Sequence, residues 1–297
     1  MMRPRIAAAL GAIVLLAAAC SGGATPDPGA LSVVVTYPVL GAVVADLVGD
    51  RAALTILMGN GVDPHDWSPS AKDIERVEKA GLVVANGLGL EEGLEKALAE
   101  AAKRGVVVFR ATDHVTVRQR AAGEGGGGEA GGDPHFWVDP LAMRDVVLAL
   151  APALAGVGID VADRAPALAA RLADLDAATR AVLAVVPEAR RRLVTGHESM
   201  GYFADRYGFR LVGAVIPGLT SQGEVSAGEL AALRAAIEAQ GVAVIFTEIG
   251  TPAAVVEAIG RETGAAVVEL PSHTLPADGS YATFIGQIAT AIATALR

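Results

Sequence analysis

Short apolar runs alternate with amphipathic stretches along most of this chain. Seven runs, most of them rich in β-branched residues, predict strands at 32–36, 82–85, 106–109, 192–195, 211–216, 242–247 and 266–269. Helical patterns lie between several of them, at 41–48, 70–79, 90–103, 228–239 and 252–263. Continuously apolar strands separated by helices are typical of parallel sheets covered on both faces. The sequence therefore predicts an α/β fold with mostly parallel sheets.

The middle of the chain breaks this rhythm. Residues 161–186 carry a long helical pattern, with apolar positions at Leu168, Leu172, Leu175 and Val182. We therefore predict two α/β lobes joined by one long helix, with an N-terminal lobe at 31–158, a linker helix at 159–187 and a C-terminal lobe at 188–297. The alternative is a crossover helix within a single sheet.

The start of the chain is typical of an export segment. Two arginines precede an apolar run at 6–19, which is too short for a membrane span with typical flanks. Small residues then lead to Cys20, in an order that resembles a bacterial lipobox. We expect a signal peptide at 1–19, a lipidated Cys20 and a flexible tether at 20–30, which together place the protein at the extracytoplasmic face of the cell membrane. An ordinary secreted protein with a chance cysteine is the alternative.

Composition narrows the class further. Cys20 is the only cysteine of the 297 residues, so the protein has neither an internal disulfide nor a metal site built on several thiolates. The net charge of −9 argues against a nucleic-acid partner. Nothing in the pattern indicates oligomerisation, and we expect a monomer.

Four of the five histidines lie in loop-like settings that occur in pairs. His65 and His135 each follow an Asp-Pro dipeptide, while His197 and His273 come just after predicted strands. Open α/β sheets place ligand sites at the carboxyl ends of their strands, and neutral imidazole is a common ligand of divalent transition metals. Each of these histidines alone would more often be structural, but together they predict one metal site between the lobes. His114 lacks such a setting and is predicted to be a surface residue.

Three acidic residues adjoin these motifs. Asp66, Asp139 and Glu198 could orient the imidazoles, or they could serve as helix caps and turn residues instead.

The longer motifs resemble a known family. They begin at Asp63 (DPHDWSP), Asp133 (DPHFWVDP), Thr195 (TGHESMGYF), Gly223 (GEVS) and Val244 (VIFTE). With these motifs the chain resembles, from about residue 31 to its end, the zinc- and manganese-binding solute-binding lipoproteins of bacterial ABC importers, known as cluster A-I. The resemblance implies two α/β lobes bridged by a rigid long helix, a metal buried between them, and an ABC permease as partner. Carried over residue by residue, it implies the metal ligands His65, His135 and His197.

The fourth ligand departs from the family pattern. At the position that matches the family's usual carboxylate this chain has His273, and Asp278 is a competing candidate. The loop before His135, which is rich in histidine in many zinc-specific members, consists here of Gly, Glu and Ala.

Ligand chemistry then bears on the metal. Four imidazoles favour Zn²⁺, and also Cu²⁺ or Ni²⁺, over Mn²⁺, and they suit the tetrahedral geometry of zinc. If Asp278 or Glu224 ligates instead, Mn²⁺ becomes more credible as the cargo. A zinc hydrolase is disfavoured, since the His-Glu-x-x-His pattern is absent and a fourth histidine leaves no open position. We therefore expect no enzyme, with a metal-dependent surface adhesin as a further alternative.

Overall fold

The computed structural model describes residues 31–120 and 131–297. The predicted signal peptide, Cys20 and the tether lie outside the described residues, as does most of the Gly- and Glu-rich loop before His135. Residues 31–297 form one compact unit. Within the described part of the chain, no helix has the length and apolar character needed to cross a membrane.

The N-terminal half contains a four-stranded parallel sheet in the order β2-β1-β3-β4. Its strands are β1 Ser32–Val35, β2 Ala53–Ile56, β3 Leu82–Ala85 and β4 Val107–Arg110. The helices between them are α1 Pro38–Val48, α2 Ala71–Glu78 and α3 Glu95–Lys103, with short 3-10 turns at Glu92–Leu94 (η1) and Ala111–His114 (η2). Pro38 lies in the first turn of α1, where its missing N–H costs nothing. The predicted strands at 32–36, 82–85 and 106–109 are confirmed.

The C-terminal half repeats this arrangement in the order β10-β9-β7-β8, again with parallel pairing. Its strands are β7 Arg192–Thr195, β8 Arg210–Ala214, β9 Val244–Thr247 and β10 Ala266–Glu269. The helices of this half are α6 Gly201–Tyr207, α7 Ala227–Gln240 and α8 Ala253–Thr263, with a 3-10 turn at Glu188–Arg190 (η5). The two sheets confirm the predicted α/β class with mostly parallel strands.

Between the halves runs a short antiparallel ribbon of β5 Gln119–Arg120 and β6 Gly131–Gly132. The Arg120 side chain is fully buried and forms a salt bridge with Glu198, whose Oε1 also accepts the N–H of Gly218 at 3.1 Å. Because Glu198 directly follows His197, this buried pair connects the ribbon to the loop after β7.

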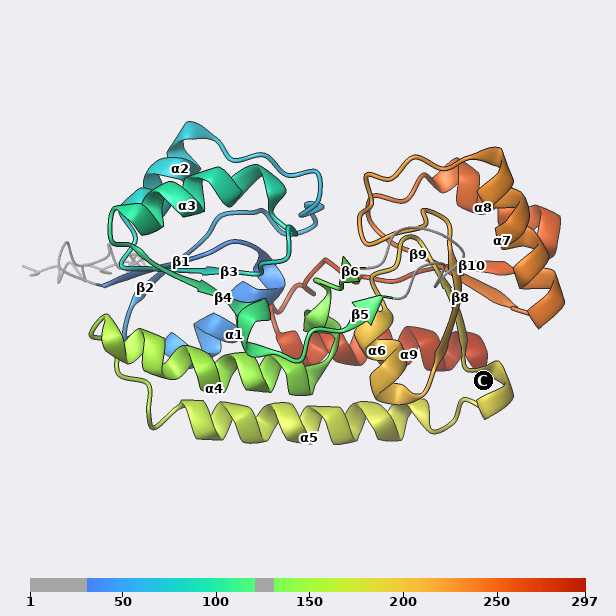
Figure 1. The fold of residues 1–297 in the computed structure, drawn as a ribbon. Helices are drawn as coiled ribbons and strands as arrows, with labels where there is room; N and C mark the ends of the chain where they lie inside the picture. Colours follow the sequence, from blue (N-terminus) through green and yellow to red (C-terminus); the bar gives the residue numbers. More distant parts are fainter. Residues whose placement is uncertain (1–30, 121–130) are drawn as a thin grey trace, which may run out of the picture. The chain divides into compact units, whose positions relative to one another are not determined.

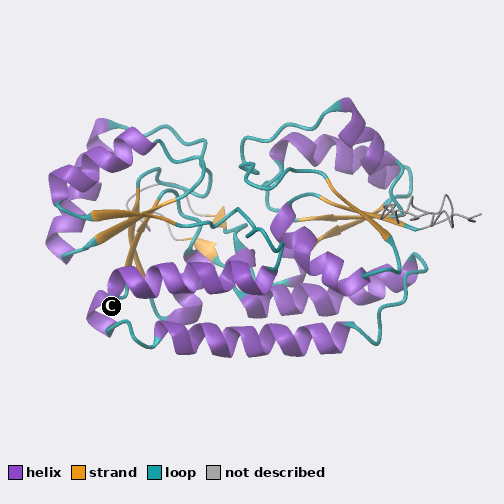
Figure 2. Cartoon of the chain, turned by 180° about the vertical axis from the view of Figure 1, so that it is seen from behind, coloured by secondary structure: helices purple, strands orange, loops and turns teal. Residues whose placement is uncertain are grey.

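A layer of long helices lies beneath both sheets (Figure 1). It consists of α4 Pro140–Gly156, α5 Ala165–Leu183 and α9 Tyr281–Leu296, and a 3-10 turn at Phe136–Val138 (η4) leads into α4. The 19-residue α5 extends roughly 28 Å at about 1.5 Å per residue and packs against both α4 and α9. The view from behind shows the same layer spanning the two sheets (Figure 2). The long helix that joins the two lobes is therefore present.

That helix is shorter than the pattern suggested. It begins at Ala165 and ends at Leu183, inside the predicted 161–186. Leu168 and Leu172 are buried as expected, but Val182 is 40% exposed, because it lies near the end of α5 on the side away from the core.

One hydrophobic core cluster runs through both halves. It includes Val33 of β1, Leu172 of α5, Phe246 of β9 and Phe284 of α9. The C-terminal helix α9 also contacts α1, so the last helix of the chain packs against the first lobe. The two sheets therefore share one close-packed interior.

The role of α5 in this shared core can be tested. Replacing Leu172, which is 3% exposed, with alanine should lower the free energy of unfolding by about 2–5 kcal/mol. The Asp174→Ala variant alters an exposed position two residues away and should change it by less than about 0.5 kcal/mol. Urea unfolding of the mature chain gives both values, and equal effects would contradict the assignment of α5 to the core.

Candidate metal centre

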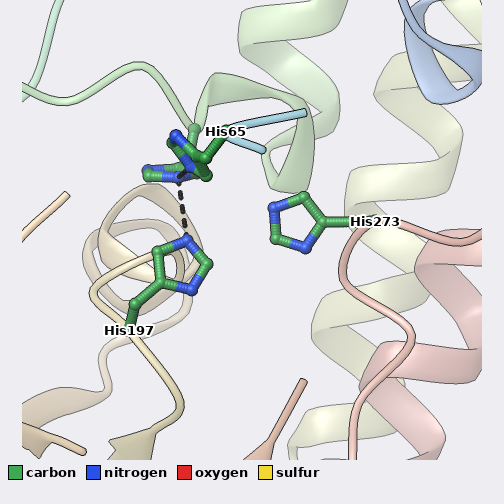
Figure 3. Close-up of side chains that lie close together, drawn as sticks. His65, His197 and His273 are labelled. Carbon is green, nitrogen blue, oxygen red and sulfur yellow. Dashed lines mark hydrogen bonds between the residues drawn. The ribbon is translucent and has the colours of Figure 1, made fainter. Parts of the chain in front are cut away.

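The structure brings the four predicted histidines together. His65, His197 and His273 follow the carboxyl ends of β2, β7 and β10, and His135 lies between β6 and η4. One ring nitrogen of each lies within 4.8 Å of one ring nitrogen of every other. Figure 3 shows that the rings of His65, His197 and His273 point toward one another from different loops.

The distances within this cluster suit a tetrahedral metal. The Nε2 atom of His135 lies 3.1 Å from that of His65 and 3.2 Å from that of His197. Tetrahedral zinc with Zn–N distances of about 2.0–2.1 Å separates its nitrogen ligands by about 3.3 Å. The distances from His135 to His65 and from His135 to His197 therefore match the ligand spacing of a zinc site, and a ring nitrogen of His273 lies within 4.8 Å of the others.

Carboxylates hold two of the rings. Asp133 Oδ1 lies 2.8 Å from Nδ1 of His135 and also accepts the backbone N–H of that histidine at 2.9 Å. Glu248 Oε1 lies 3.0 Å from Nδ1 of His197 and accepts its backbone N–H at 3.1 Å. An Nδ1–H that faces a carboxylate leaves the Nε2 lone pair free for a metal.

Glu248 also reaches the fourth histidine. Its carboxylate accepts hydrogen bonds from the hydroxyls of Ser199 and Ser272, and the Ser272 Oγ lies 2.9 Å from Nδ1 of His273. The Trp137 indole N–H donates to the carbonyl of Ser272 at 2.9 Å. The His273 Nε2 is buried and has no hydrogen-bond partner in the described part of the chain, so it remains available to an ion.

The positions of the hydrogens on His135 and His197 decide whether a cation is favoured between the two rings. Nδ1 of His135 contacts the Asp133 carboxylate, and Nδ1 of His197 lies 3.0 Å from Glu248; when both of these nitrogens carry a hydrogen, a neutral pair points two Nε2 lone pairs at each other across 3.2 Å. Lone pairs at that distance repel, and either a proton or a metal ion between them removes the repulsion. The arrangement therefore favours a cation between these two rings.

The protonation of the cluster follows from burial and charge. Burial lowers the pKa of His65, His135 and His273, and for each of them a charge on a neighbouring imidazole lowers it further. Burial also acts against a charged His197, but the Glu248 carboxylate outweighs it and raises the pKa of His197. Three of the four imidazoles are therefore neutral and ready to bind a metal near neutral pH, and His197 is the one that holds a proton most readily.

The four histidines differ in their exposure to solvent. His135 and His197 are fully buried, His273 is 5% exposed, and His65 is only half-buried. A cavity of about 330 Å³ reaches His65 between the two sheets, with Leu88, Glu92, Thr220 and Gln222 among its lining residues. His65 is thus the member of the cluster nearest to solvent.

The alternative ligands lie elsewhere. The Asp278 carboxylate accepts hydrogen bonds from Ser280 and Thr283 at the exposed start of α9, and Glu224 is exposed. His114 is exposed and stacks on Phe109 with 4.4 Å between ring centroids, as predicted for a surface residue.

Two of the three acidic neighbours considered in the sequence have other roles. Asp139 caps α4 and pairs with Arg206, and Glu198 pairs with Arg120. The carboxylates that orient the imidazoles are Asp133 and Glu248 instead. The sequence could have indicated Asp133, because it belongs to the same Asp-Pro-His motif as His135. It could not indicate Glu248, which contacts a histidine 51 positions earlier in the chain.

Comparison with known proteins agrees with this geometry. Residues 33–295 match the family described as zinc-uptake complex component A, periplasmic. The zinc-binding protein TroA of Treponema pallidum is 32% identical over 266 residues, which cover 87% of this chain and 84% of TroA. The manganese-binding lipoprotein MntA of Halalkalibacterium halodurans is 26% identical, over 85% of this chain and 83% of MntA.

Solved structures give the same result. The structure of the periplasmic zinc-binding protein TroA from Treponema pallidum superposes with a TM-score of 0.78 at 28% identity, covering 90% of this chain and 99% of that one. Since the family match extends over nearly all of the described residues, the chain belongs to the family of periplasmic zinc-uptake complex component A proteins.

Proposed function

We propose that this protein is an extracytoplasmic solute-binding protein that captures a divalent transition metal, foremost zinc, and delivers it to an ABC permease. The observation that carries the proposal is the convergence of four imidazole nitrogens within 4.8 Å of one another. In this proposal His65, His135, His197 and His273 are the metal ligands, and the metal is cargo. Membership in a zinc-uptake family supports the transport role.

Zinc suits this donor set better than manganese does. Four imidazoles offer no hard anionic oxygen, and nitrogen ligands favour Zn²⁺ over Mn²⁺ in the usual order of affinities. Manganese is the second candidate, because one relative is named as a manganese-binding lipoprotein. The buried Glu248 carboxylate, which lies behind two of the imidazoles, supplies negative charge for either cation.

The same donor set argues for binding rather than catalysis. A catalytic zinc keeps one position open for water or substrate, whereas four protein ligands close a tetrahedral shell. We therefore assign no enzymatic activity to this site. Lipidation at Cys20 would hold the protein, as a monomer, at the membrane that contains the permease.

The ligand assignment predicts one zinc ion per chain. Replacing His273 with alanine should weaken zinc binding by more than about 100-fold, which exceeds the 10–100-fold typical of residues behind the ligands. Competitive titration of the mature protein against a zinc chelator measures this. The His114→Ala variant alters an exposed histidine outside the cluster and should bind zinc like the unmodified protein.

Unchanged affinity in His273→Ala would remove His273 from the ligand set. In cells, zinc accumulation at low external zinc should depend on the protein and should be lost with His135→Ala. Metal analysis of the protein isolated from its host distinguishes zinc from manganese, because availability also selects the metal.

Proton release provides a second test. At pH 6, zinc binding should displace about one proton, from His197, because the other three imidazoles have lowered pKa values and are already neutral. Four histidines with the usual pKa of about 6.5 would together release about three protons at this pH. Calorimetry in buffers of different ionisation enthalpy counts the protons.

In Glu248→Gln the release should fall below one proton, since burial alone lowers the pKa of His197. The affinity of this variant should decrease about 10–100-fold. A release of two or more protons from the unmodified protein would contradict the assigned protonation.

The membrane anchor can be tested separately. A Cys20→Ala variant expressed in a bacterial host that processes lipoproteins should move from the membrane fraction to the soluble exported fraction, because no second anchor is expected. Its zinc affinity should stay unchanged, since Cys20 is not a ligand. Fractionation followed by immunoblotting measures the distribution, and a variant that stays in the membrane fraction would argue against lipidation.

A further inference from the structure

The aspartates of the two Asp-Pro-His motifs share one hydrogen bond and differ in their second contact. In both, the aspartate Oδ1 accepts the backbone N–H of the histidine, at 3.0 Å for Asp63 and His65 and at 2.9 Å for Asp133 and His135. Asp133 also contacts the ring of its own histidine. Asp63 instead accepts, through Oδ2, a hydrogen bond of 2.5 Å from the hydroxyl of Ser221, which is 6% exposed in the loop after β8.

Asn60, which lies in the same loop as Asp63 and His65, also contacts the C-terminal half. The Asn60 carboxamide forms two hydrogen bonds with the main chain of Leu275, donating to its carbonyl and accepting its N–H, both at 2.8 Å. Leu275 follows His273 by two residues. Asn60 therefore links the His65 loop, residues 57–70 between β2 and α2, to the segment that carries His273.

The opposite half also makes room for Asp63. Gly250, in the loop after β9, has a φ of +83°, and a Cβ atom added there would lie 2.3 Å from Asp63 Oδ2. Three successive loops of the C-terminal sheet, after β8, β9 and β10, thus meet the His65 loop at Ser221, Gly250 and Leu275.

We infer that Asn60 and Asp63 are positioning residues, which hold His65 in its ligand geometry across the cleft and thereby set the rate of zinc release. The inference rests on the proposed zinc-binding function. Buried carboxylates hold the rings of His135 and His197, and Ser272 adjoins that of His273. His65 and His273 each line a cavity, but His65 is the less buried of the two, since His273 is only 5% exposed. His65 is therefore the ligand placed to leave first. Its departure requires the bonds of Asn60 and Asp63 to break.

The test replaces Ser221 and Asn60, which form the cross-cleft hydrogen bonds but have no hydrogen bond to His65. Ser221→Ala removes the hydroxyl that binds Asp63, and Asn60→Ala removes both bonds to Leu275. Each variant should release zinc about 3–10-fold faster, as expected for the loss of one or two hydrogen bonds, while the association rate stays within about twofold. Stopped-flow release into excess chelator gives the dissociation rate, and mixing with limiting zinc gives the association rate.

Controls separate positioning from general damage. Ser221→Thr keeps a hydroxyl and should restore slow release, and Gln287→Ala, an exposed amide on α9 outside the cleft, should have no effect. The visible spectrum of the Co²⁺-loaded variants should match that of the unmodified protein, because all four ligands are retained.

Two outcomes would overturn the inference: unchanged release in both Ser221→Ala and Asn60→Ala, or an altered Co²⁺ spectrum, which would mean that the ligand set itself had changed. If the unmodified protein does not bind zinc, the proposed function fails first. That result is distinguishable, because it appears in the equilibrium titration of the unmodified chain.

Discussion

The proposed metal centre depends on the contact between the Nε2 atoms of His135 and His197, 3.2 Å apart. Two buried carboxylates, Asp133 and Glu248, lie at 2.8 and 3.0 Å from the Nδ1 atoms of these rings and favour a hydrogen there, which leaves the Nε2 lone pairs facing each other. Such a pair is tolerated only with a cation between the rings. In the metal-free protein a proton on His197 can serve, which agrees with the raised pKa of that residue. A divalent metal takes the place of that proton and gains two further imidazoles.

The rest of the fold limits how this centre can open. A single hydrophobic cluster runs through both sheets, and α5 and α9 pack against each other beneath them. Separating the sheets would expose part of a close-packed core, which is costly in water. Loops have fewer buried contacts and open at lower free energy. Metal exchange is therefore expected to proceed by movement of a loop, and the half-buried His65 is the least buried of the four histidines.

Most strands and the four histidines of the cluster could be predicted from the sequence, because each is marked by a pattern of neighbouring residues. The β-branched runs mark seven of the eight strands of the two large sheets; β2, with the sequence Ala-Leu-Thr-Ile, is short and half-exposed and was not recognised. Helix α9 was also missed, since its exposed side has threonine, alanine and glutamine in place of charges. Glu248 could not be recognised as the residue behind His197 and His273, because tertiary folding alone creates those contacts.

The two Asp-Pro-His motifs show where local reasoning ends. Their backbone hydrogen bonds are nearly identical in length, as expected from a turn that the sequence specifies by itself. The second contact of each aspartate depends on what the fold places beside it: the imidazole of His135 for Asp133, and the hydroxyl of Ser221 for Asp63. Both motifs lie in the N-terminal half, yet one aspartate holds the ring of a proposed ligand, and the other connects the loop of a proposed ligand to the C-terminal half. Because a motif specifies only the contacts within its own turn, identical motifs can have different mechanical roles in one metal site.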